Sequence, residues 1–84
     1  MWRVFLTAHA ERQFRRLPKE AARRIGRAID TMQGDPLDGD IAKLEGRGYA
    51  WRRRIGNYRI LFEIIPAKRI VFIYDVTRRA SKTY

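Results

Sequence analysis

The sequence contains no cysteine, so disulfide bonds and thiolate metal ligands have no part in this protein. It contains one histidine, His9, and a lone imidazole forms no metal site without carboxylates around it. No stretch of about 18 consecutive apolar residues is present, so we expect no membrane-spanning helix. The apolar part of the amino terminus is too short for a signal peptide, which needs about 7–15 such residues. We therefore expect a cytoplasmic protein that requires neither a metal nor another cofactor.

Acidic residues are also scarce, with nine Asp and Glu against nineteen Lys and Arg and a formal net charge of +10. Residues 1–42 hold eight basic and six acidic residues, a net charge of +2, whereas residues 43–84 hold eleven and three, a net charge of +8. The basic excess thus belongs to the half that we predict to form strands. A basic surface on folded strands indicates a polyanion or an acidic protein as the partner. A membrane surface is less favoured, since the basic segment is not an amphipathic helix.

A chain of 84 residues builds one small core, and we expect a single domain over residues 1–84. The hydrophobic periodicity predicts a strand over residues 2–6, a helix between Thr7, its N-cap, and Pro18, and a second helix over about 19–33. A loop over 34–48, a hairpin over about 49–65 and a strand over 69–76 follow. This β-α-α-β-β-β order predicts an α+β fold, in which a helical hairpin packs on one face of a twisted, mainly antiparallel four-stranded sheet. A right-handed crossover favours a parallel pairing of the first strand with a later one, for which the last strand is the candidate.

The most informative stretch is the predicted hairpin, in which two strand-like runs flank the two-residue loop Gly56-Asn57. With this loop, Arg54 lies opposite Arg59. Because side chains alternate along a strand, Arg53 falls on the same face as the apolar residues. Those apolar residues are Trp51, Ile55, Tyr58, Ile60, Phe62 and Ile64. The opposite face carries Arg52, Arg54, Arg59, Leu61 and Glu63, and is therefore a patch of guanidinium groups.

This arginine patch has two interpretations. Charge runs commonly form a solvated surface, and Arg54 facing Arg59 costs up to about 1 kcal/mol. The functional alternative is an anion site, because guanidinium groups bind phosphate through paired hydrogen bonds and stabilise charge that develops on it. The sequence contains no Ser-His-Asp order, Walker loop or Gly-x-Gly-x-x-Gly motif. RNA supplies its own nucleophile, the 2′-hydroxyl, so an enzyme can cleave it mainly through positioning and electrostatics.

Four segments together resemble the RelE branch of the RelE/ParE toxin superfamily, and their order spans essentially the whole chain. They are Leu17-Pro18-Lys19, Lys43-Leu44-Glu45-Gly46, residues 51–63 with the core Gly56-Asn57-Tyr58-Arg59, and the ending Arg78-Arg79…Tyr84. The resemblance implies a toxin of a type II toxin–antitoxin system, which enters the ribosomal A site and cleaves mRNA there without a metal. It also implies a cognate antitoxin that wraps the toxin, and a toxin–antitoxin complex that binds operator DNA.

The resemblance assigns roles to single residues. The basic pair on the strand before the glycine turn is Arg52 and Arg54, and the arginine after the turn is Arg59. The arginine after the last strand is Arg79, and the carboxyl-terminal stacking tyrosine is Tyr84. Further RNA contacts are expected from Lys43, Arg78 and Lys82. Some relatives have lysines at the basic pair and others use a Glu and a carboxyl-terminal His, which this chain lacks, so the proton acceptor stays open.

Three functions are compatible with these observations. The first is a ribosome-dependent mRNA endonuclease that stops translation and growth. The second is a non-catalytic inhibitor of DNA gyrase, the activity of the ParE branch, which shares the fold. The third is a degenerate toxin that only binds nucleic acid. An antitoxin for this chain is expected to be acidic over its docking segment and to add a helix or a strand to the toxin surface.

Overall fold

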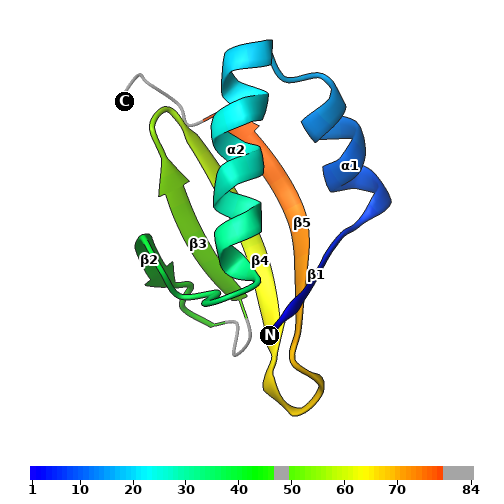
Figure 1. Cartoon of the computed structure of the whole chain (residues 1–84). Helices are drawn as coiled ribbons and strands as arrows, with labels where there is room; N and C mark the ends of the chain where they lie inside the picture. The colour runs from blue at the N-terminus through cyan, green and yellow to red at the C-terminus, as the bar shows by residue number, and fades with distance from the viewer. Residues whose placement is uncertain (47–49, 79–84) are drawn as a thin grey trace.

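A computed structural model describes residues 1–46 and 50–78, in which two helices and five strands are present (Figure 1). The helices are α1 (Ala8–Arg15) and α2 (Lys19–Met32). The strands are β1 (Arg3–Leu6), β2 (Asp40–Lys43), β3 (Ala50–Ile55), β4 (Tyr58–Ile65) and β5 (Ile70–Arg78), and a short 3₁₀ helix over Pro66–Lys68 lies between the last two. Neither helix of this described part is long and apolar enough to cross a membrane.

The strands form one mixed sheet in the order β1-β5-β4-β3-β2. β1 runs parallel to β5, and the other neighbouring strands are antiparallel. The predicted α+β fold class and the parallel pairing of the first and last strands are therefore confirmed. The predicted count of four strands is wrong, because part of the predicted loop over 34–48 forms β2.

The additional strand is the edge strand β2, which pairs antiparallel with β3. Its four residues place Asp40 opposite Arg54 and Lys43 opposite Trp51. Edge strands are commonly short and charged, which protects their free backbone groups from pairing with other chains. A four-residue strand with a charge at each end has too little apolar alternation to be recognised in the sequence.

The two helices cover one face of the sheet, which we call the helix face. In Figure 1, α2 crosses in front of the sheet and α1 lies beside β5. Thr7 caps α1 as predicted, since its Oγ1 accepts a hydrogen bond of 3.2 Å from the backbone N–H of Ala10. The buried core joins the apolar stripe of α2 to the central strands through Ile25, Ala28, Met32, Ile60, Phe62, Ile64, Val71, Ile73 and Val76. This rigid layer supports the opposite sheet face, which neither helix covers.

The helix α1 also covers an edge of β5, because β1 ends opposite Ile73. Beyond that point Gln13 of α1 takes the place of a neighbouring strand. Its Oε1 accepts a hydrogen bond of 2.7 Å from the backbone N–H of Val76, and its Nε2 donates one of 3.1 Å to Asp75 Oδ1. The side-chain amide therefore satisfies a backbone donor that would otherwise be left without a partner.

Candidate nucleic-acid interface

The hairpin of β3 and β4 has the predicted register, with Ile55 opposite Tyr58 and Arg54 opposite Arg59. Its turn needs a glycine for its backbone conformation, and this glycine also lies against Arg24 of α2. Gly56 has a φ of 58°, in the left-handed region. A Cβ at this position would also lie 2.7 Å from Nη2 of Arg24, because the guanidinium group of α2 rests against the turn. The turn that fixes the register is thus shaped by both the backbone and the helix layer.

The register separates the hairpin side chains into two environments. On the helix face, Ile60 and Phe62 are fully buried. On the opposite face, which we call the open face, Arg54 and Arg59 are exposed and Arg52 is half-buried. The three guanidinium groups of Arg52, Arg54 and Arg59, which we call the arginine patch, therefore extend from two adjacent strands on the same side of the sheet.

Arg53 has a structural role on the helix face. Its Nη1 donates hydrogen bonds to the backbone carbonyl of Ala28, at 3.1 Å, and to Oγ1 of Thr31, at 3.0 Å. Both acceptors belong to α2, so this side chain ties β3 to the helix. Gly39 leaves room for it, since a Cβ there would lie 2.8 Å from Nε of Arg53. The side chain of Arg53 is thereby separated from the arginine patch.

The arginine patch lacks neutralising partners within the described part of the chain. Arg54 faces Arg59 on one side and Asp40 of β2 on the other, yet neither arginine forms an ion pair shorter than 4 Å there. Nη1 of Arg52 is buried and has no hydrogen-bond partner among the described residues. Leaving a buried donor unsatisfied costs about 1–3 kcal/mol. Arg54 and Arg59, whose side chains are exposed, are the members of the patch that an anionic ligand reaches directly.

The carboxylate nearest to the patch along β5 is already engaged. Thr77 lies opposite Arg59, and its Oγ1 donates a 3.0 Å hydrogen bond to Asp75 Oδ2. Nε2 of His9 lies 3.6 Å from Oδ1 of Asp75. The sequence shows no sign of this His9–Asp75 pair, because 66 positions separate the two residues. No group of three His, Asp or Glu side chains in residues 1–46 and 50–78 is arranged to hold a metal ion.

The remaining predicted site residues lie elsewhere. Lys43 is opposite Trp51, and its Nζ is 5.9 Å from the centroid of that ring, on the helix face. Arg78 is opposite Tyr58 and lines a hollow of ≈ 280 Å³ beside the start of α2. The structure therefore does not bring Lys43 or Arg78 onto the open face with the arginine patch. The predicted residues Arg79, Lys82 and Tyr84 lie outside the described residues.

Comparison with known proteins identifies relatives of this chain in sequence and in structure. The sequence is 29% identical over 66 residues to "Putative toxin RelE1" from Methanocaldococcus jannaschii, over 75% of this chain and 73% of that protein. A chain of the archaeal RelE–RelB complex from Pyrococcus horikoshii OT3 matches with a TM-score of 0.85 and 26% identity, over 96% of this chain and 98% of that one. A chain of the RelBE2 toxin–antitoxin complex from Mycobacterium tuberculosis matches with a TM-score of 0.81 and 25% identity, over 93% and 98%.

The family comparison agrees with these similarities and confirms the predicted superfamily. The model described as "ParE toxin of type II toxin-antitoxin system, parDE" matches residues 4–82. This chain therefore belongs to the ParE toxin family, within the RelE/ParE superfamily, and is a RelE-like toxin of a type II toxin–antitoxin system.

Proposed function

We propose that this toxin is an endoribonuclease that cleaves mRNA in the A site of the ribosome and thereby stops translation. The observation that carries the proposal is the arginine patch itself. Arg52, Arg54 and Arg59 lie on the open face, with no acidic ion-pair partner among the described residues. A set of unneutralised guanidinium groups on a rigid sheet suits a phosphodiester, which offers oxygen acceptors in the geometry that arginine prefers.

The chemistry we propose uses the nucleophile that RNA carries. The 2′-oxygen attacks the adjacent phosphorus atom and forms a new P–O bond, while the bond from phosphorus to the 5′-oxygen breaks. The products are a 2′,3′-cyclic phosphate and a free 5′-hydroxyl, so the proton lost by the 2′-hydroxyl is matched by one gained at the 5′-oxygen. Guanidinium groups held in place before the reaction stabilise the charge that develops on the phosphoryl oxygens. No metal is needed for this role.

Five further residues enter the proposal by the family resemblance. Arg79 adds a guanidinium group at the scissile phosphate, and Tyr84 stacks on a base next to the cut. Lys43, Arg78 and Lys82 bind phosphates farther along the RNA. Arginine stays protonated at neutral pH and so does not accept the proton of the 2′-hydroxyl. The arginine patch is therefore assigned to phosphate binding and charge stabilisation.

Control of the toxin by an antitoxin is part of the proposal. RelE-like chains of similar structure were crystallised in complexes that include RelB antitoxins. We propose that a cognate antitoxin neutralises this chain in the cytoplasm and that their complex binds operator DNA through the antitoxin. The net charge of +10 favours an acidic partner segment.

The test compares purified variants on ribosomes loaded with a defined message. Wild type is expected to cut in the A-site codon. Arg59→Ala and Arg79→Ala are each expected to slow cleavage about a hundredfold or more, a typical cost of losing one group that stabilises transition-state charge. Arg23→Ala is the matched control, because this arginine is exposed on α2 and its Nη1 lies 3.5 Å from Oε1 of Glu20. Equal rates for Arg59→Ala and Arg23→Ala would contradict the assignment.

A second candidate is inhibition of DNA gyrase without catalysis. The observation that favours it is the family match, which is to a ParE description. The two functions predict different responses in cells that express the toxin alone. Cleaved ribosome-bound mRNA supports the endoribonuclease, whereas induction of the DNA-damage response with intact mRNA supports gyrase inhibition.

A further inference from the structure

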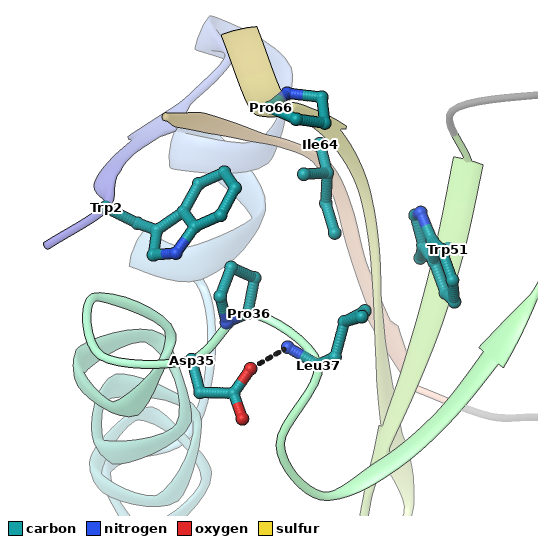
Figure 2. A pocket seen from close by; sticks show the side chains of 7 residues that line it. All are labelled: Trp2, Asp35, Pro36, Leu37, Trp51, Ile64 and Pro66. Carbon is teal, nitrogen blue, oxygen red and sulfur yellow. Dashed lines mark hydrogen bonds between the residues drawn. The ribbon is translucent and has the colours of Figure 1, made fainter. Parts of the chain in front are cut away.

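An apolar hollow of ≈ 520 Å³ opens on the helix face, beyond the carboxyl-terminal end of α2 (Figure 2). Trp2 and Trp51 form its opposite walls, with Ile64 and Pro66 at one end and Pro36 and Leu37 at the other. Trp51 and Ile64 extend from the helix face of β3 and β4. The hollow is therefore on the opposite side of the sheet from the arginine patch.

The walls of this hollow are preformed. The backbone N–H of Trp2 donates a 2.8 Å hydrogen bond to the carbonyl of Gln33, which fixes one wall to the end of α2. The backbone N–H of Leu37 donates a 3.0 Å hydrogen bond to Oδ1 of Asp35, the dashed line in Figure 2. This local bond holds Leu37 at the mouth, where it is 46% exposed although it is a large apolar side chain. A preformed apolar wall lowers the ordering cost of a partner that binds there.

The charged side chains around the hollow favour a partner with acidic residues. Cζ of Arg69 lies 5.7 Å from the ring centroid of Trp2, and Nζ of Lys43 lies 5.9 Å from that of Trp51. A cationic side chain therefore lies near each of the two tryptophan rings. The carboxylate of Asp35, the one acidic group that lines the hollow within the described residues, already accepts from Leu37. The site suits an apolar side chain that is carried by an acidic segment.

Other occupants fit less well. Small-molecule sites of this size combine apolar walls with several convergent polar groups, which this lining lacks. A second copy of the chain would bring another net charge of +10 to the same surface. RNA is expected on the open face, where the arginine patch lies.

We propose that this hollow, walled by Trp2 and Trp51 and with Leu37 at its mouth, takes an apolar anchor residue from an acidic segment of the cognate antitoxin. The proposal rests on the antitoxin pairing described under Proposed function. It also separates the docking of this segment from the RNA site, because the two lie on opposite faces of the sheet.

The chain provides its own reporter for this site, since both of its tryptophans line the hollow. Toxin labelled with fluorotryptophan should give two fluorine NMR signals. Addition of the purified antitoxin, unlabelled, is expected to shift both of them. A short RNA oligonucleotide, added instead, is expected to leave the Trp2 signal unchanged and to affect at most the Trp51 signal, whose ring lies 5.9 Å from Nζ of Lys43. Dilution of the toxin alone is expected to leave both signals unchanged.

The affinity for the antitoxin is then measured with variants of the toxin. Leu37→Glu is expected to weaken antitoxin binding about thirtyfold, because it places an unpaired carboxylate among apolar side chains that face an acidic segment. Phe5→Glu is the matched control, since Phe5 is similarly exposed, at 38%, on the open face and stacks on Phe72. It is expected to change the affinity less than about threefold, as surface positions outside an interface do. If Leu37→Glu does not fold, Leu37→Ser replaces it.

The proposal is overturned if the antitoxin leaves both signals unshifted, or if the folded Leu37 variant binds it as tightly as wild type does. It is equally overturned if RNA or dilution shifts the signals as the antitoxin does, since RNA or a second copy would then be the occupant. Absence of mRNA cleavage by wild type would contradict the endoribonuclease proposal without changing any of these readouts.

Discussion

Neighbouring arginines of β3 show how strongly the environment determines the role of a side chain. Arg53 donates hydrogen bonds to Ala28 and Thr31 of α2, whereas Arg54 extends from the open face without an ion-pair partner among the described residues. The two residues have the same chemistry and differ only in the face to which the strand alternation assigns them. One is part of the structure of the fold, and the other is available to a ligand.

This difference predicts unequal effects of two alanine substitutions on stability. Arg53→Ala should lower the free energy of unfolding by about 1.5–3 kcal/mol, because two hydrogen bonds from a charged group are lost. Arg54→Ala should change it by less than about 0.5 kcal/mol, or raise it slightly, since the repulsion with Arg59 disappears. Urea unfolding of both variants measures the effect. Similar losses for the two substitutions would contradict the separation of roles.

At the scale of elements, the hairpin is the part that the sequence predicts best. A two-residue Gly-Asn loop between strand-like runs allows one register, and the structure has that register. Long-range pairings are not predictable in the same way. Gln13 meets Asp75 and Val76 only because α1 lies beside the edge of β5, and β2 is recognisable only by its pairing with β3. Lys43 and Arg78 show the same limit, since the face on which each lies depends on the partner strand.

The turn of the hairpin predicts a coupling between Gly56 and Arg24. Gly56→Ala should cost about 1–3 kcal/mol, because alanine is strained at a positive φ and its Cβ would crowd the guanidinium group. A double-mutant cycle with Arg24→Ala separates the two causes. Part of the cost should disappear in the double variant, and the remainder is backbone strain. A cost that is the same with and without Arg24 would show that the contact is unimportant.

The edge of β5 predicts a local effect of Gln13. Gln13→Ala should expose the backbone N–H of Val76 and speed its hydrogen exchange, whereas the amides of β4 should be much less affected. The variant should also lose about 1–3 kcal/mol of stability, as expected for an unsatisfied donor. Hydrogen exchange followed by NMR measures both the local protection of the Val76 amide and the stability of the whole fold. Unchanged exchange protection of the Val76 amide would contradict the proposal that Gln13 replaces a neighbouring strand as its hydrogen-bond partner.

At the scale of the whole molecule, the two faces of one sheet carry different binding chemistry. The open face carries the arginine patch, and the helix face carries the apolar hollow beyond α2. The family assignment was predictable because its motifs keep their order along the chain. The assignment of Arg79 and Tyr84 to the site rests on that resemblance, and these residues lie outside the described part.

The arginine patch predicts the salt dependence of RNA binding. For single-stranded RNA, the logarithm of the affinity falls with the logarithm of the salt concentration by about 0.7 for each phosphate that is neutralised. Arg54→Ala should therefore reduce this slope by about 0.7, and Arg23→Ala on α2 should leave it unchanged. Fluorescence anisotropy with a labelled, uncleavable oligonucleotide measures both slopes. Equal slopes for the two variants would mean that the patch does not contact phosphate.

The central claim is that the arginine patch cleaves mRNA on the ribosome, and mapping of mRNA ends tests it most directly. Primer extension on ribosome-bound message would compare wild type with the triple variant Arg52→Ala, Arg54→Ala and Arg59→Ala. We predict new 5′ ends within the A-site codon for wild type and none for the triple variant. An intact message in cells whose growth wild type still arrests would contradict the account.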